Sequence, residues 1–188
     1  MQVKLVNSEE ELIAACAGCE LVGFHGTSSL ACEKIDTHGF LPDKVFPKAD
    51  HDQIIKIAES LEADTSCYLQ WLDMQSVSFA QHAQFAINHV TSGHSGGQGL
   101  AHVEAALKLI LDRGDEYQKD FAGPLLERIE SIRQAPVVIY AVDLSGFGAR
   151  LAHNQERAIF HYHLDPNAPF PKTSDIGPAR VIARLLLT

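Results

Sequence analysis

The sequence predicts an α+β fold, in which strands lie near both ends of the chain and helices fill the middle. Three observations support this fold class. An apolar strand pattern, "ELVGF", occurs close to the N-terminus. Apolar residues recur at helical spacing through most of the chain up to Pro136. After Pro136 the pattern is that of strands, with an apolar run in "VVIYAVDL", alternation in "RAIFHYHL" and branched residues in "ARVIARLLL".

Two helices are predicted around the first strand. Ser8 is placed to cap the first helix, and Glu11 can close a capping box because it follows three residues later. This helix is predicted to end near Gly18. The second helix lies in "SSLACEKIDTHGF", where Ile35 belongs to an apolar set at helical spacing and Gly39 ends the pattern.

The middle of the chain is predicted to be mostly helical from residue 42 to about residue 75. Its clearest feature is the apolar stripe formed by Ile54, Ile55, Ile57, Ala58 and Leu61. "SVSFA" predicts a short strand or turn, and "QHAQFAINHV" predicts a helix. "TSGHSGGQG", residues 91–99, predicts a flexible loop, and residues 100–134 predict one or two amphipathic helices. Near the C-terminus, "SDIGPAR" predicts a turn.

The composition limits the classes of function. The chain has 188 residues, of which 46% are hydrophobic, which suffices for one domain with a sizeable core. The formal net charge of −9 disfavours a protein that grips a phosphate backbone, so nucleic acid is not an expected partner. No apolar run has the length of a signal peptide or a membrane span, so no membrane partner is expected. The four cysteines lack zinc-site spacing and are expected to be reduced thiols in a reducing compartment: Cys16, Cys19, Cys32 and Cys67.

The stretch "FHGTSS" is the first candidate for chemistry. His25 and Thr27 share one face of the predicted strand, because side chains repeat every two residues, and together they suit hydrogen bonds to sugar hydroxyls or an amide. A second interpretation is structural. In that case Gly26 permits a strand-to-helix turn, and Thr27 or Ser28 caps the helix.

The longer stretch "FHGTSSLACEKIDTHGF" resembles the first motif of the ADP-ribosyltransferases that carry a histidine, the branch of poly(ADP-ribose) polymerases and diphtheria-like toxins. In that family a strand ends in His-Gly-Ser/Thr, and a helix carrying an Ile leads to Gly-Phe or Gly-Leu. RNA 2'-phosphotransferases share this motif. The residues at the matching places are His25, Gly26, Thr27, Ile35, Gly39 and Phe40.

Two later stretches resemble the family's other motifs in the same order. In "SVSFAQHAQFA", Ser78 stands at the place of the usual first tyrosine and Phe85 at that of a later aromatic residue. In "NQERAIFHYHL", Glu156 opens a predicted strand, as the family's acidic residue does. Ser78 departs from the family pattern, because it removes one wall of the nicotinamide site; Tyr68 or Trp71 could replace it. The family's acceptor choice does not carry over, since Asn154 stands two places before Glu156.

The resemblance implies a single domain, residues 1–188, with a split antiparallel β-sheet and helical insertions at about 41–75 and 100–134. It implies NAD as the substrate. His25 would hold the adenosine ribose with help from Thr27, the Gly26 backbone would bind the nicotinamide amide, Ser78 would line the site, and Phe85 would stack on the ring. Glu156 would bond the ribose 2'-hydroxyl and offset the charge of the oxocarbenium-like transition state. The implied catalytic residues are therefore Glu156 and His25.

The expected function is transfer of a single ADP-ribose from NAD to a protein acceptor. By analogy with the family, the enzyme would be cytoplasmic, or a secreted bacterial toxin or effector that acts in a host cytosol. Alternatives are an NAD glycohydrolase, a non-catalytic binding module with a degenerate NAD cleft, and an RNA 2'-phosphotransferase, whose phosphate ligands would come from Arg150, Arg157 and Arg180. His161 and His163 share a strand face, but no acidic third ligand stands at a telling distance, so no metal is expected.

Overall fold

The computed structural model describes residues 3–42, 44–74, 76–94, 98–163 and 175–187. The chain forms two compact units. The first, which we call the sheet unit, comprises Met1–Pro42, Gln75–Ser95 and Ala135–Thr188. The second, the helical unit, comprises Asp43–Met74 and Gly96–Gln134. The segments predicted as helical insertions, about 41–75 and 100–134, fall almost entirely in the helical unit.

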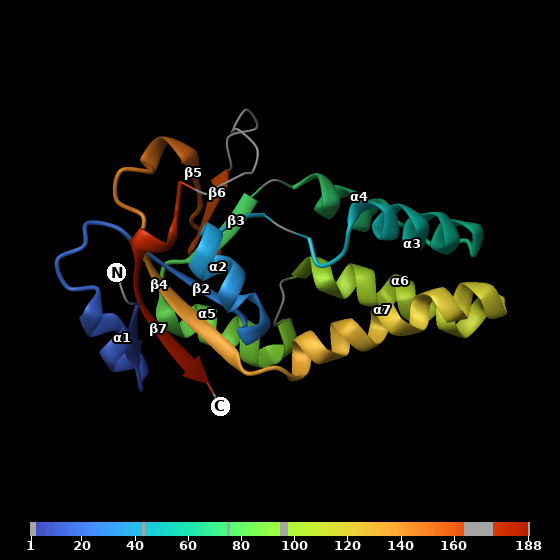
Figure 1. Ribbon diagram of the computed structural model, residues 1–188. Coiled ribbons are helices and arrows are strands. Elements are labelled where there is room, and N and C mark those ends of the chain that lie inside the picture. Colours follow the sequence, from blue (N-terminus) through green and yellow to red (C-terminus); the bar gives the residue numbers. More distant parts are fainter. Residues whose placement is uncertain (1–2, 43, 75, 95–97, 164–174, 188) are drawn as a thin grey trace. The chain divides into compact units, whose positions relative to one another are not determined.

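The sheet unit is built on a seven-stranded mixed sheet, which confirms the predicted α+β class (Figure 1). The strand order is β1-β7-β4-β2-β3-β6-β5; β1 runs parallel to β7, and all other neighbours are antiparallel. The strands are β1 (Lys4–Val6), β2 (Val22–Ser28), β3 (Ser76–Ala80), β4 (Val137–Asp143), β5 (Leu151–Asn154), β6 (Ile159–His163) and β7 (Val181–Leu187). The helices are α1 (Glu9–Ala15), α2 (Cys32–His38) and α5 (Ala83–His89), with short turns η1 (Ser29–Ala31), η2 (Val90–His94), η3 (Gly148–Arg150) and η4 (Pro178–Arg180).

Apolar cores cover both faces of this sheet. On one face Tyr140 of β4 packs in a cluster with Ile35 of α2. On the other face Ile139 packs in a cluster with Leu12 of α1 and Ala86 of α5. Successive side chains of a strand point to opposite faces, so β4 needs apolar residues at every position. This explains why "VVIYAVDL" is apolar without alternation.

The two ends of α1 show how the local sequence sets the boundaries of a helix. Ser8 caps α1 as predicted, because its Oγ accepts a hydrogen bond from the Glu11 backbone N–H at 3.2 Å. The Glu11 carboxylate in turn accepts from the N–H of Asn7 at 2.9 Å, one residue before the cap. The helix ends at Ala15, earlier than predicted, and Gly18 follows in the left-handed region at φ 91°.

Gly39 ends α2, as the sequence predicts. Its φ is 76°, a value that favours glycine, and its N–H donates to the carbonyl of Ile35 at 2.8 Å. A Cβ at this position would collide with the carbonyl oxygen of Ile176. The next residue, Phe40, donates its N–H to that same oxygen at 3.1 Å. The Gly-Phe pair therefore ties the end of α2 to the segment before β7.

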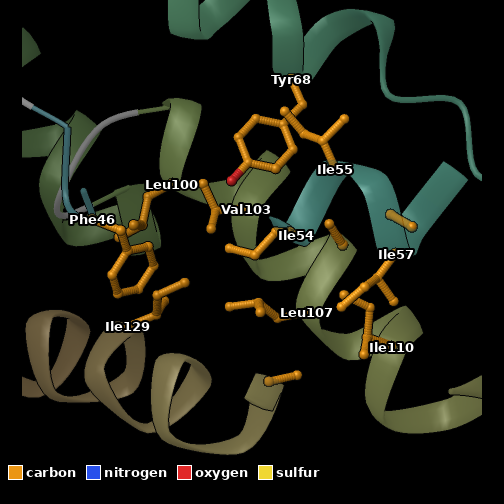
Figure 2. Close-up of a cluster of buried hydrophobic side chains, with 13 residues drawn as sticks. Phe46, Ile54, Ile55, Ile57, Tyr68, Leu100, Val103, Leu107, Ile110 and Ile129 are labelled. Atoms are coloured by element: carbon orange, nitrogen blue, oxygen red, sulfur yellow. The ribbon is translucent and has the colours of Figure 1, made fainter. Parts of the chain in front are cut away.

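The helical unit consists of α3 (Lys48–Ser60), α4 (Ser66–Asp73), α6 (Gln98–Arg113) and α7 (Glu116–Gln134). The predicted stripe of α3 is confirmed, since it contributes to the buried cluster that Figure 2 shows between these helices. Residues 100–134 form two helices, α6 and α7, on either side of Gly114. The members of the cluster are Phe46, Ile54, Ile55, Ile57, Ala58, Tyr68, Leu100, Val103, Ala106, Leu107, Ile110, Ala122 and Ile129.

A polar pair lies inside this apolar core. The side chain of His51 is 1% exposed, and its Nδ1 lies 2.6 Å from the hydroxyl of Tyr68, which is also buried. Burial lowers the pKa of His51 and raises the pKa of Tyr68, because it disfavours the charged form of each. Both side chains are therefore neutral at neutral pH.

Several predicted segments differ from the structure. The loop predicted at residues 91–99 is helical at both ends, within η2 and α6, and its centre, residues 95–97, lies outside the described residues. In "SDIGPAR", η4 forms the end of the predicted turn, and Ser174 lies outside the described residues. "SVSFA" is strand β3. Among the described residues, no helix is both long and apolar enough to cross a bilayer.

Candidate ligand site at the split of the sheet

The sheet opens between β2 and β3. β2 pairs with β4 along the whole of Val22–Ser28, whereas its described pairing with β3 is limited to Phe24 opposite Ala80. The ring of His25 lies at this opening, with Nδ1 3.0 Å from the backbone carbonyl of Ser78. A carbonyl oxygen only accepts, so Nδ1 carries the proton and donates it. In neutral His25, Nε2 is then an acceptor for a hydroxyl or amide of a ligand.

The surroundings of His25 keep it neutral. Its ring contacts two aromatic side chains, with centroid distances of 5.2 Å to Phe40 and 5.7 Å to Phe79. Burial lowers its pKa; the Ser78 carbonyl acts in the opposite direction, and His89 lowers the pKa further. His25 therefore keeps a hydrogen-bond acceptor at Nε2 at neutral pH.

Ser78 connects His25 to a second histidine. The exposed side chain of Ser78 places Oγ 2.9 Å from Nδ1 of His161, which is the residue opposite it on β6. Burial lowers the pKa of His161, and the nearby charges of His163 and Arg157 lower it further. His25, Ser78 and His161 thus form a chain of hydrogen bonds through the carbonyl and the hydroxyl of one serine.

The structure assigns a packing role to Gly26. A Cβ there would lie 2.6 Å from Cγ1 of Val90 and 3.0 Å from the carbonyl oxygen of Ala86. Gly26 therefore lets α5 and η2 pack directly on β2. At the corner after the strand, Ser28 rather than Thr27 provides the cap, because its Oγ accepts from the N–H of Leu30 at 3.3 Å. Thr27 itself is buried.

Phe85 lies on α5 with 54% of its side chain exposed, and its ring faces His82 at a centroid distance of 6.3 Å. An open cavity of about 350 Å³ lies near the start of the same helix. Phe24 lines this cavity. Because Phe24 and His25 are consecutive on β2, their side chains point to opposite faces of the sheet. The residues that line the cavity are Glu9, Ile13, Phe24, Gln81, His82, Ala83 and Gln84.

Glu156 lies in the turn between β5 and β6, at residues 155–158, and is exposed. The strand that it was expected to open begins three residues later, at Ile159. The turn is fixed by Ala158, which has a φ of 49° and whose carbonyl accepts from the N–H of Gln81 at 2.9 Å. The β6 side chain that contacts Ser78 is His161. The sequence prediction that Glu156 opens this strand is therefore wrong.

The arginines considered as phosphate ligands are largely engaged. Arg150 forms an ion pair with Asp175 and donates to the carbonyl of His163 at 3.2 Å. Arg180 forms an ion pair with Asp143 at 3.3 Å. Arg157 lies exposed in the turn beside Glu156. Two of the three guanidinium groups therefore already have carboxylate partners, which weakens the case for a phosphotransferase.

The structure also shows the surroundings of the cysteines and of Tyr68, which the sequence analysis singled out. All four cysteines are free thiols. In the described part of the chain, no three His, Cys, Asp or Glu side chains gather closely enough to hold a metal ion. Tyr68, considered as a substitute wall for the nicotinamide site, is buried against His51 in the helical core. His161 was noticed in the sequence only through the alternation "FHYHL", which does not reveal its partner on β3.

Comparisons with known proteins add no relative. No protein-family model, curated protein or solved structure matches the chain. The hydrogen bonds around His25 and the sequence motifs are therefore the grounds for a function.

Proposed function

We propose that the sheet unit is an ADP-ribosyltransferase-like domain that binds NAD at the opening between β2 and β3 and transfers one ADP-ribose to a protein. The observation that carries this proposal is the hydrogen bond from His25 Nδ1 to the carbonyl of Ser78 at 3.0 Å. It fixes the ring in the tautomer whose Nε2 accepts from a ribose hydroxyl. The first sequence motif supports it as well, since Gly39 and Phe40 hold the end of α2 as that motif requires.

In the proposed reaction the bond between the ribose C1″ and the nicotinamide nitrogen breaks, and nicotinamide leaves with the bonding electron pair. A nucleophile of the acceptor protein forms the new bond to C1″, and its proton passes to a base or to water. A carboxylate near the ribose stabilises the positive charge of the transition state. Glu156 is the candidate, and it would approach the ribose from the β5–β6 turn.

A second candidate function is a module that binds NAD without chemistry. It is favoured by the position of Glu156 in an exposed turn, while a histidine and a serine face each other at the opening of the sheet. Both candidates share the same ligand, so binding alone does not separate them.

The test is incubation of the full chain with NAD labelled in the adenylate part, with and without a mixture of cytosolic proteins. Label on protein supports transfer, free labelled ADP-ribose supports NAD hydrolysis, and NAD binding by calorimetry without either product supports the module. Absence of binding refutes both candidates. For transfer, Glu156→Gln should lower the rate on the order of 10²-fold, whereas Gln155→Ala in the same turn should leave it within twofold of wild type.

A further inference from the structure

The C-terminal end of α1 carries a pair of cysteines that the candidate ligand site does not include. Cys16 and Cys19 are separated by two small residues, Ala17 and Gly18. Both cysteines are free thiols, and both are half-buried. In the part of the chain that the structure describes, no group of metal-binding side chains includes them. The chemistry open to the pair is therefore that of two neighbouring thiols.

The backbone folds this pair into a tight turn. The N–H of Cys19 donates a hydrogen bond to the carbonyl of Cys16 at 3.1 Å. Gly18, the third residue of the turn, has a φ of 91°, which favours glycine. A hydrogen-bonded turn of four residues places its first and last Cα atoms less than about 7 Å apart. Disulfides join Cα atoms about 4.4–6.8 Å apart. The turn thus brings the two cysteines within reach of a disulfide bond.

The chain is held in place on both sides of the turn. Before it, Leu12 is fully buried in the core beneath α1, and its carbonyl accepts a hydrogen bond from Sγ of Cys16 at 3.3 Å. After it, the N–H of Leu21 donates to Oγ of Ser145 at 3.2 Å, and the carbonyl of Leu21 accepts from the N–H of Leu144 at 2.9 Å. Because both ends are fixed, the folded chain holds the two thiols near each other.

We propose that Cys16 and Cys19 form a reversible disulfide by exchange with a low-molecular-weight disulfide such as oxidised glutathione. In the first step a thiolate attacks one sulfur of glutathione disulfide, whose S–S bond breaks, and one glutathione leaves as a thiolate that takes up a proton. In the second step the other cysteine loses its proton to water and attacks the mixed disulfide, which releases the second glutathione. Two protein thiols are oxidised, and one glutathione disulfide is reduced to two thiols.

The surroundings of Cys16 set the order of the two attacks. Burial raises the pKa of the Cys16 thiol, and the negative charge of a nearby Cys19 thiolate raises it further. Cys16 is therefore less ionised than a free cysteine and reacts more slowly with an external disulfide. The first attack falls to Cys19. Cys16 makes the second attack, in which the turn compensates for its low ionisation.

The first experiment detects the disulfide in the full, folded chain. The protein is incubated with oxidised glutathione, the remaining thiols are blocked with iodoacetamide, and the chain is cleaved after glutamate. Peptide 12–20 then contains Cys16 and Cys19 and no other cysteine. We expect this peptide to be about 2 Da lighter than its dithiol form and to carry neither glutathione nor an alkyl group. Cys67, which is exposed and belongs to the helical unit, should instead retain one glutathione.

Serine variants test the pairing and the order of attack. Cys16→Ser should leave glutathione attached to Cys19, because the second attack is lost. Cys19→Ser should react at Cys16, but at a rate about fivefold or more below that of Cys19 in Cys16→Ser. Cys32→Ser is the matched control and should form the disulfide within twofold of the wild-type rate. If wild-type peptide 12–20 stays unmodified, retains glutathione, or is crosslinked to Cys32, the proposal is overturned.

A glycine variant tests whether the folded turn positions the thiols. Gly18→Ala forces a side chain into a positive φ, so release of glutathione from the mixed disulfide should slow by about fivefold or more. Gly146→Ala is the matched control, since Gly146 has a φ of 85° and, like Gly18, no atom within 4 Å of an added Cβ. The control should react as wild type does, and wild type unfolded in urea should be slow. Equal rates in Gly18→Ala, in urea and in folded wild type would overturn the inference.

Discussion

His25 donates a hydrogen bond from Nδ1 to the backbone carbonyl of Ser78, at 3.0 Å, across the gap where β2 and β3 separate. The imidazole thereby satisfies a strand carbonyl that lies beyond the described pairing of these two strands. It also leaves Nε2 as an acceptor. A single side chain therefore serves both the sheet and the proposed ligand.

Replacement of His25 by alanine should weaken NAD binding. The lost hydrogen bond to a ribose hydroxyl contributes about 1 kcal/mol, so Kd should rise about fivefold to tenfold. Isothermal titration calorimetry at pH 7.5 measures this change. His38→Ala, an exposed histidine at the end of α2, is the control and should bind as wild type does. Equal affinities for His25→Ala and wild type would remove His25 from the binding site.

Replacement of Gly26 by alanine should destabilise the sheet unit. The new methyl group would lie 2.6 Å from Val90 and 3.0 Å from the Ala86 carbonyl, so α5 would have to shift at a cost of about 1–3 kcal/mol. Hydrogen exchange of residues 22–28 should become faster. Gly148→Ala is the control, because no atom lies within 4 Å of a Cβ at that position. Unchanged exchange in Gly26→Ala would show that α5 does not pack on β2 as described.

The stability of the helical unit should decrease in mild acid because of His51. Its pKa is lowered in the folded chain, so below the ordinary value of about 6.5 the unfolded chain takes up a proton that the folded chain does not. Protonation of His51 therefore does not change the stability above that pH, and the stability falls as the pH drops from about 6.5 toward the lowered pKa. The residues that influence this titration by charge are Lys44, Asp50 and Asp52.

Urea unfolding at pH 7.5 and pH 5.0 tests this prediction, with Trp71 fluorescence as the probe. Trp71 is the only tryptophan and lies in α4 of the helical unit, 5.8 Å from His51 between ring centroids. His51→Leu should be less stable than wild type at pH 7.5, since it leaves the buried Tyr68 hydroxyl without its partner, and should lose less stability on acidification. His102→Ala, an exposed histidine of α6, should retain the wild-type pH dependence. An identical pH dependence in His51→Leu and wild type would exclude His51 as its source.

Two glycines of the helical unit should respond in opposite ways to alanine. A Cβ at Gly99 in α6 would collide with the indole of Trp71, so Gly99→Ala should cost about 1–3 kcal/mol and shift the fluorescence of Trp71. A Cβ at Gly123 in α7 meets no atom within 4 Å, so Gly123→Ala should stabilise the helix by about 0.5–1 kcal/mol. Urea unfolding of both variants measures the difference. Destabilisation of equal size in both would contradict the packing of Trp71 on Gly99.

The sequence predicted those elements whose apolar residues are numerous and regularly spaced. The α3 stripe and the apolar β4 are examples, because each buries a complete face or both faces. β1 and β5 were not predicted. β1 has three residues, of which Lys4 and Leu5 are exposed, and β5 has four residues with little burial. Such short edge strands form because they pair with a neighbouring strand. The local sequence pattern does not reveal that pairing.

The candidate site was predicted in part. A local sequence motif was enough to single out His25 and to predict that α2 ends at Gly39. In the structure His25 is hydrogen-bonded to the carbonyl of Ser78, and Gly39 ends α2. The contact between Ser78 and His161 depends on the register of β3 and β6, which joins residues 83 positions apart. The place of Glu156 depends on where the β5–β6 turn ends, and the positive φ of Ala158 sets that point. Neither register nor turn length is encoded in the alternation of "RAIFHYHL".

The pairing of β1 with β7 joins the first and last strands of the chain in one sheet. β7 must therefore leave the ribosome before this edge of the sheet can close. The helical unit, whose last residue is Gln134, is fully synthesised before the central strand β4 emerges. We expect the helices to fold during translation, before β4 and β7 are available to complete the sheet. Deletion of β7 should consequently prevent the sheet from forming and remove every activity that depends on it. The helical unit should stay folded.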